Sequence, residues 1–237
     1  IPVINAGDGA HEHPTQTLLD LFTLWREYGR LTGLKIAFCG DLKRNRSVHS
    51  LIHALLRFGV ELYLVPAQGL KLPDFVSRRI AATAGVSVEE MPSGPFKPLF
   101  EADSDERSGV QLSDTELDVD VLYVTNVKPN QPTLIPTSSR RGRKTWSLKS
   151  EEMVLYLTRR QVEREPKGQD KGVNRGGYFK VTGEVLGRSF KRAIVMHPLP
   201  RVDEIAREVD KGDRARYFEQ ARYGVPIRQA LIAKILG

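Results

Sequence analysis

Short apolar segments alternate with helical patterns along most of the chain. Apolar residues recur at helical spacing over residues 14–28, 48–58, 73–84 and 227–236. Between these patterns lie short apolar runs at residues 34–39, 60–65, 119–125, 154–158 and 193–197, with a weaker one at 86–91. Continuous apolar runs of this length are typical of strands that are buried on both faces. The alternation therefore predicts an α/β fold, a doubly wound parallel sheet flanked by helices.

The first predicted helix has clear start and stop signals. Leu18, Phe22 and Trp25 follow the i, i+4, i+7 spacing of one helical face. Pro14 suits the first helical position, because the N–H that proline lacks has no helical partner there. Gly29 ends the apolar pattern, as glycine does after many helices.

Two stretches of the chain fit no regular element. Residues 101–113 are acidic and polar, whereas residues 126–150 contain three prolines and a basic cluster. A loop of that length without structure is uncommon inside a compact domain. We therefore interpret residues 126–150 as an insertion.

Composition narrows the class of protein. Hydrophobic residues make up 40% of the 237 residues and charged residues 27%, which is ordinary for a globular protein. No apolar run approaches the roughly 18 residues that span a bilayer, and the first residues lack the basic region of a signal peptide. The single cysteine, Cys39, cannot form an internal disulfide. We expect no membrane partner and a cytoplasmic location.

The net charge of +7 raises the question of nucleic acid. Much of the excess lies at residues 140–149, and no aromatic-interleaved basic motif accompanies it. We therefore expect no nucleic-acid partner. A basic module would instead bind with a steep salt dependence that maps to residues 140–149.

Polar residues follow three of the predicted strands. Residues 40–47 (GDLKRNRS) follow the first, Arg159, Arg160 and Gln161 follow the run at 154–158, and Pro198–Arg201 follow the last. Ligands bind at the carboxyl ends of parallel strands, and arginine matches a carboxylate or phosphate with two parallel hydrogen bonds. Several arginines at this edge suit a small dianion. The alternative is that each arginine lies in a solvated surface pair.

The sequence gives no support for a metal or a nucleotide cofactor. Residues 40–47 match neither the dinucleotide fingerprint G-x-G-x-x-G nor the phosphate-binding loop G-x-x-x-x-G-K-[ST]. His11 and His13 are two residues apart, whereas two zinc ligands on one helical face are four apart. We therefore expect no cofactor and no metal.

Two segments can handle a carbonyl and an amine. His13 precedes the predicted helix, whose positive end favours a neutral imidazole that can donate to a carbonyl, and Gln16 lies in the first turn. The alternative is that His13 only caps the helix. Residues 197–200 (HPLP) form a rigid turn that presents backbone carbonyls, and one X-Pro bond there is a candidate for the cis form. The alternative is a rigid turn without a ligand.

Taken in order, four motifs resemble the catalytic chain of the aspartate carbamoyltransferase family. They are HEHPTQTLLDLFT at 11–23, GDLKRNRSVHSL at 40–51, VLYLTRRQVERE at 154–165 and HPLPRVDEIAREVD at 197–210. The C-terminal residues 217–236 match as well, so the resemblance covers most of the chain outside the two irregular stretches. Ornithine carbamoyltransferases are similar but carry His-Cys-Leu-Pro at the last motif, so Pro198 favours aspartate.

The resemblance implies transfer of the carbamoyl group of carbamoyl phosphate to the α-amino group of L-aspartate. The products are N-carbamoyl-L-aspartate and phosphate, in pyrimidine biosynthesis, and family members are usually homotrimers. By resemblance the carbamoyl contacts are His13, which binds the carbonyl oxygen, with Gln16, Pro198 and Leu199. By the same resemblance the aspartate-binding residues are Arg46, Arg159 and Gln161.

The resemblance also divides the chain. It implies a linking segment and helix at 1–29, an aspartate-binding domain at 30–222 with an insertion at 126–150, and a C-terminal helix at 223–237 that returns to the carbamoyl-phosphate domain. The Ser-Thr-Arg-Thr phosphate cluster of the family has no counterpart in these residues, so we expect little activity from the chain alone. We also expect residues 14–28 and 227–236 to expose an apolar face. The alternative function is a non-catalytic amino-acid-binding or regulatory domain.

The runs at 119–125 and 153–158 resemble two versions of one strand, where the family has a single strand. We assign the functional strand to the second run, because Arg159 and Gln161 follow it. The alternative is that the first run takes the strand position and displaces the second.

Overall fold

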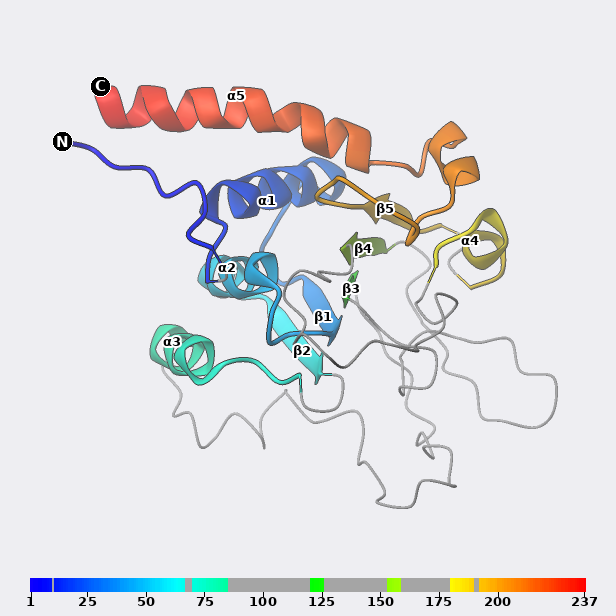
Figure 1. Cartoon of the computed structure of the whole chain (residues 1–237), viewed down its shortest axis with the longest axis horizontal. Coiled ribbons are helices and arrows are strands. Elements are labelled where there is room, and N and C mark those ends of the chain that lie inside the picture. Colours follow the sequence, from blue (N-terminus) through cyan, green and yellow to red (C-terminus); the bar gives the residue numbers. More distant parts are fainter. Residues whose placement is uncertain (10, 67–69, 85–119, 126–152, 159–179, 190–191) are drawn as a thin grey trace, which may run out of the picture.

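The computed structural model describes the chain except for residues 10, 67–69, 85–119, 126–152, 159–179 and 190–191 (Figure 1). Within these limits five parallel strands form one sheet in the order β2-β1-β3-β4-β5. The strands are β1 (Lys35–Gly40), β2 (Glu61–Pro66), β3 (Val121–Thr125), β4 (Val154–Thr158) and β5 (Ile194–Met196). The helices are α1 (Pro14–Tyr28), α2 (Arg46–Leu55), α3 (Asp74–Ala84), α4 (Gly183–Ser189) and α5 (Tyr217–Leu236), with short 3-10 turns η1 (Leu56–Phe58) and η3 (Arg207–Lys211).

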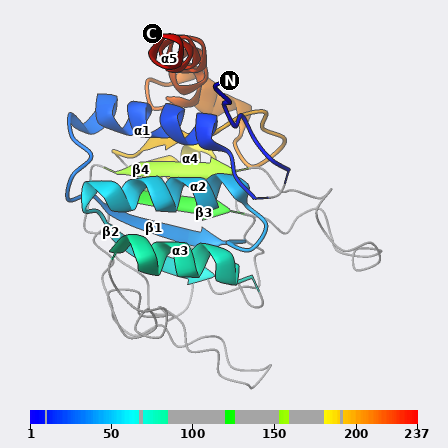
Figure 2. The ribbon, with the colours of Figure 1, turned by 90° about the vertical axis from the view of Figure 1, so that its left-hand side faces the viewer.

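Both faces of the sheet are buried, as the continuous apolar runs predict. Ile36 and Phe38 of β1 belong to a core that includes residues of α1, α2 and α3. Ala37 and Cys39, which alternate with them, belong to a second core that includes residues of α4 and the start of α5. Figure 2 shows α1, α2 and α3 together on one face, with α4 behind the sheet and α5, seen end-on, packed against α1. The doubly wound α/β prediction is confirmed.

The two similar runs form neighbouring strands. β3 and β4 pair in parallel, with Tyr123 opposite Tyr156 and Thr125 opposite Thr158. The tyrosine rings lie 4.2 Å apart between centroids. The alternative that one copy displaces the other is therefore wrong, because the sheet accommodates both side by side. The weaker strand predicted at 86–91 lies outside the described residues.

Helix α1 has the predicted ends, and its buried side mixes leucines (Leu19, Leu21 and Leu24) with polar residues. Pro14 occupies the first turn, and Gly29 ends the helix with a left-handed φ of 68°. Thr15, Asp20 and Thr23 are buried, whereas Leu18 and Trp25 are 39% and 46% exposed. The expectation of an exposed apolar face on this helix is confirmed.

Helix α5 begins at Tyr217, earlier than the predicted Ile227. Gly224 and Pro226 indicate a helix break, yet the helix continues through both. Proline cannot bond to the carbonyl four residues earlier. The carbonyl without a helical partner is therefore that of Arg222. Two residues further on, the Gly224 carbonyl accepts a side-chain hydrogen bond from Arg228 at 2.8 Å. Ile232 and Leu236 are exposed, as expected for the C-terminal segment. None of the described helices has the length and apolar character needed to cross a bilayer.

Candidate functional site

A buried hydrogen bond joins the start of α2 to the carboxyl end of β4. Asn45 caps α2, and its side-chain oxygen accepts from the backbone N–H groups of Ser47 and Val48 at 3.1 and 3.3 Å. Its Nδ2 donates to Oγ1 of Thr158 at 3.0 Å. Because Arg46 follows Asn45 in the chain and Arg159 follows Thr158, this bond brings together the backbones that lead into two predicted aspartate-binding residues. Arg159 and Gln161 themselves lie outside the described residues.

Arg46 is the first residue of α2 and is half-buried. Its Nη1 donates to the carbonyl oxygen of Gly9 at 3.1 Å. A Cβ at Gly7 would lie 3.0 Å from the same Nη1, so glycine there permits the close approach of the guanidinium. Among the described residues no carboxylate forms an ion pair with Arg46. The remaining hydrogen-bonding capacity of this guanidinium is therefore available for an external carboxylate.

Arg201 has a different role from the predicted one. Both of its terminal nitrogens donate to the carboxylate of Asp210, and Nη1 also donates to the Tyr217 hydroxyl at 3.1 Å. The hydrogen bonds from Arg201 hold the pKa of Asp210 below its ordinary value. Arg44 likewise pairs with Asp41 at 3.5 Å. The expectation that several arginines converge on one ligand is thus wrong for Arg201, whose fork is filled by Asp210.

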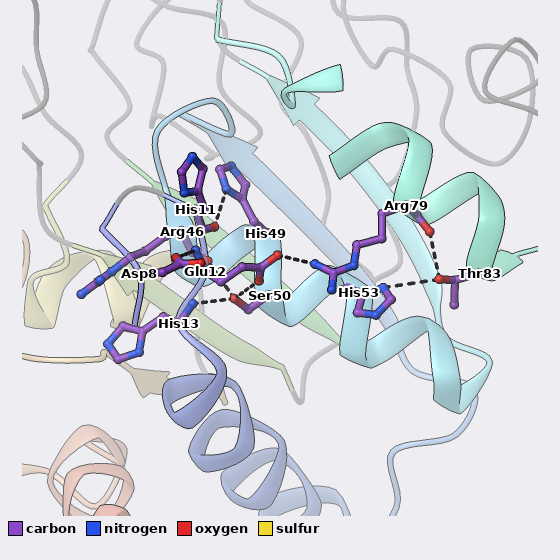
Figure 3. A network of polar contacts seen from close by, with 10 residues as sticks. All are labelled: Asp8, His11, Glu12, His13, Arg46, His49, Ser50, His53, Arg79 and Thr83. Carbon is purple, nitrogen blue, oxygen red and sulfur yellow. Dashed lines mark hydrogen bonds and ion pairs between the residues drawn. The ribbon is translucent and has the colours of Figure 1, made fainter. Parts of the chain in front are cut away.

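The segment before α1 is tied to α2 and α3 by polar contacts (Figure 3). Glu12 accepts from Nη1 of Arg79 at 2.5 Å and from Oγ of Ser50 at 2.5 Å. Ser50 in turn accepts from the backbone N–H of His13 at 2.7 Å. The ring nitrogens of His49 lie 3.1 and 2.9 Å from the carbonyl oxygens of His11 and Leu42. These contacts fix the chain path that delivers His13 to the start of α1.

His13 stands at the N-cap position of α1, but its side chain makes no capping hydrogen bond. The alternative that this histidine only caps the helix is therefore wrong. In Figure 3 its ring and the Arg46 side chain point to the same side, away from Glu12 and Ser50. The two side chains come from the starts of different helices, α1 and α2. The bond from the His13 N–H to Ser50 holds these two helix starts together.

Asp20, in the second turn of α1, carries a fully buried carboxylate. Its Oδ1 accepts from Nε2 of Gln16 and from Nε2 of Gln220, both at 2.8 Å, and its Oδ2 accepts from the Tyr156 hydroxyl at 2.7 Å. Burial raises the pKa of Asp20 to about 7, although the three hydrogen bonds oppose the shift. Sequence reasoning missed Asp20 and Gln220. The only local signal was an acidic residue inside the apolar run LLDLF.

The turn at 197–200 is held from several sides. The buried His197 donates its backbone N–H to Oε1 of Gln220 at 2.8 Å, and its Nδ1 accepts from the backbone N–H of Leu199 at 2.9 Å. Nε2 therefore carries the ring proton and donates to Oε1 of Glu204 at 2.7 Å. Burial of Glu204 opposes its ionisation, but hydrogen bonds from His197 and the backbone outweigh burial and lower its pKa.

The backbone of this turn has an unusual conformation. The Leu199–Pro200 bond is cis, which confirms the sequence-based candidate, and Leu199 has a left-handed φ of 50°. Within the described chain the carbonyls of Pro198 and Leu199 accept no hydrogen bond. Each therefore keeps its acceptor capacity for a ligand. The described residues contain no cluster of three potential metal ligands.

Comparison with protein families gives two matches. A model of the Asp/Orn binding domain of aspartate/ornithine carbamoyltransferases matches residues 149–235. A model of the carbamoyl-P binding domain of the same enzymes matches residues 1–26. Both matched regions include residues singled out above: the 197–200 turn lies in the Asp/Orn binding match, and His13 and Gln16 lie in the carbamoyl-P binding match.

Curated relatives and solved structures agree with these matches. The aspartate carbamoyltransferase catalytic subunits of Methanocaldococcus jannaschii and Thermoplasma acidophilum are 38% and 39% identical to the chain over its whole length. The chain spans 60% of the length of each. A structure of the M. jannaschii catalytic subunit matches with a TM-score of 0.60 and 34% identity, over 100% of this chain and 60% of that one. Trypanosoma cruzi aspartate transcarbamoylase in complex with carbamoyl phosphate matches with a TM-score of 0.60 and 31% identity, over 98% and 59%. The chain therefore belongs to the aspartate carbamoyltransferase family.

Proposed function

We propose that this chain supplies the aspartate-binding part, and one side of the carbamoyl site, of an aspartate carbamoyltransferase. The reaction is attack of the α-amino group of L-aspartate on the carbonyl carbon of carbamoyl phosphate, which gives N-carbamoyl-L-aspartate and phosphate. The hydrogen bond between Asn45 and Thr158 carries the proposal. It places the start of α2 against the carboxyl end of β4, where ligands of parallel sheets bind.

Arg46, Arg159 and Gln161 are the proposed aspartate-binding residues. A guanidinium grips a carboxylate through two parallel hydrogen bonds, and aspartate carries two carboxylates. Arg46 has no carboxylate partner among the described residues, which suits it to this role. Arg159 directly follows Thr158, the residue that bonds to Asn45, so the chain enters Arg159 beside the start of α2.

His13, Gln16, Pro198 and Leu199 are the proposed carbamoyl contacts. The carbamoyl group combines a carbonyl oxygen, which accepts hydrogen bonds, with an NH₂ group, which donates them. A neutral His13 at the N-terminus of α1 is suited to donate to the oxygen, where negative charge develops during attack. The carbonyls of Pro198 and Leu199 are suited to accept from the NH₂ group. Catalysis of this kind rests on holding the two substrates in attack geometry and on stabilising that charge.

The substrates and the division of the chain follow the same comparison. T. cruzi aspartate transcarbamoylase has been solved in complex with carbamoyl phosphate and aspartate. We propose the same substrates for the protein to which this chain contributes. We also propose a linking segment at 1–29, an aspartate-binding domain at 30–222 with an insertion at 126–150, and a C-terminal helix at 223–237. A homotrimeric parent and a cytoplasmic location stay predictions.

The proposal is tested by binding of N-(phosphonacetyl)-L-aspartate, which combines a phosphonate with an aspartate. We expect saturable shifts of amide NMR signals around Arg46 in the folded chain. Arg46→Ala should weaken binding about 30-fold or more, because it removes a charge-assisted pair of hydrogen bonds. Arg26→Ala is the matched control, since Arg26 is an exposed arginine on α1. A folded chain with no perturbation near Arg46 would contradict the proposal.

A further inference from the structure

The buried carboxylate of Asp20 connects the two segments proposed to contact the carbamoyl group. Gln16 bonds to Oδ1 of Asp20 directly. The 197–200 turn bonds to the same oxygen through Gln220, because the Gln220 amide accepts from the His197 N–H and donates to Asp20. The bond from Gln220 to Asp20 is a long-range contact between α5 and α1. Through Gln220 this contact extends to His197 after β5.

The direction of each bond in this bridge is fixed by chemistry. A backbone N–H can only donate, so Gln220 must turn its amide oxygen to His197 and its amide nitrogen to Asp20. Oδ1 of Asp20 is therefore an acceptor. The same oxygen receives the amide nitrogen of Gln16, which leaves the amide oxygen of Gln16 able to accept from a ligand. The carbonyls of Pro198 and Leu199 are acceptors as well.

We propose that Asp20 and Gln220 are positioning residues that hold Gln16 and the 197–200 turn in one hydrogen-bonded unit, so that both present acceptor oxygens to the NH₂ group of the carbamoyl moiety. This inference rests on the proposed function, which supplies the ligand. Neither residue touches the ligand in this account. Asp20 acts through Gln16, and Gln220 acts through His197.

The surroundings of Asp20 make its ionisation the controlling variable. The titratable groups that interact with it are Tyr156 on β4 and Tyr123 on β3, and the described residues place no cation in contact with it. The other two groups that bond to the carboxylate are the neutral amides of Gln16 and Gln220. An ionised carboxylate accepts hydrogen bonds more strongly than a neutral acid. The unit is therefore tight above pH 7 and looser below it.

The bridge is tested directly by NMR on the isotope-labelled chain. We expect the side-chain NH₂ signals of Gln16 and Gln220 and the backbone N–H of His197 to share one titration midpoint near pH 7. Asp20→Asn, which has nearly the same shape without the charge, should remove that midpoint at all three positions. Gln220→Met should remove it at His197 while Gln16 still titrates. The exposed Arg26→Gln on the same helix is the control and should keep all three.

The functional side is tested with N-carbamoyl-L-aspartate, whose carboxyl groups titrate well below neutral pH. We expect its affinity for the wild-type chain to rise about tenfold between pH 6 and pH 8. Asp20→Asn should bind at the weaker level and lose this rise.

Separate midpoints at Gln16 and His197, or a shared midpoint that survives in Asp20→Asn, would overturn the bridge. These readings need no ligand. A chain that shows the bridge but binds neither N-carbamoyl-L-aspartate nor N-(phosphonacetyl)-L-aspartate would instead contradict the proposed function. If Asp20→Asn does not fold, the wild-type midpoints and Gln220→Met still decide.

Discussion

A single buried residue, Asp20, makes the stability of the folded chain depend on pH. Its pKa is about 7 in the fold and 3.8 in the reference state, because burial disfavours the charged form. The folded state therefore binds this proton more tightly than the unfolded chain does. The stabilising contribution is present below pH 4 and is lost as pH rises through 7. The folded chain is thus less stable when Asp20 is ionised, although the ionised carboxylate holds Gln16 and Gln220 best.

Asp20→Asn should flatten this pH dependence. We expect the free energy of unfolding of the wild type to fall between pH 5 and pH 8 by on the order of 2–3 kcal/mol more than that of the variant. Urea unfolding at the two pH values measures both differences, and the comparison cancels groups shared by the two proteins. Parallel pH profiles for wild type and variant would show that Asp20 titrates normally.

At the scale of elements, the join between α2 and β4 depends on Asn45, which both caps the helix and bonds to the neighbouring strand. Asn45→Ala removes both interactions and should destabilise the chain by about 2 kcal/mol. Thr158→Val removes only the strand contact and should cost about 1 kcal/mol while the cap persists. Both should weaken N-(phosphonacetyl)-L-aspartate binding, since both loosen the path into Arg46 and Arg159. Unfolding curves measure the stabilities, and ligand titrations measure the affinities. Unchanged affinity in both variants would show that the Asn45–Thr158 contact does not position the binding site.

The strands and most helices were predictable because buried parallel strands appear as apolar runs bounded by Gly, Pro and polar residues. The start of α5 was not, because Gly224 and Pro226 signal a break that the helix tolerates. The site was predictable where a motif carries it, as at His13, Arg46 and Pro198. The Asp20 bridge was not predictable, because Gln220 lies 200 residues from Asp20 and no local pattern reports such a pairing. Arg201 was misjudged for a different reason: its partner Asp210 lies only nine residues away, but the chain path between them, and not a regular helical or strand spacing, brings the two together.

At the scale of the whole molecule, α1 packs against α5 (Figure 1). Both helices expose large apolar side chains. Trp25 on α1 is 46% exposed, and Leu236 on α5 is 74% exposed. Exposed apolar patches of this kind favour association. They occur on the two segments that we assign to contacts with a carbamoyl-phosphate domain.

The isolated chain should therefore bind a hydrophobic dye and associate as its concentration rises. A variant with Trp25→Lys and Ile232→Lys should show less of both, whereas Val202→Lys, an exposed apolar position away from these helices, should not. Sedimentation and dye fluorescence measure the effect. A wild-type chain that stays monodisperse and causes no increase in dye fluorescence would contradict this prediction.

The central claim is tested most directly by turnover. The chain is joined to the carbamoyl-phosphate domain of the M. jannaschii relative, and formation of N-carbamoyl-L-aspartate is measured. We predict turnover that Arg46→Ala lowers by about 100-fold or more and that Arg26→Ala leaves unchanged. A folded assembly that binds both substrates without turnover would contradict the claim and favour a non-catalytic binding domain.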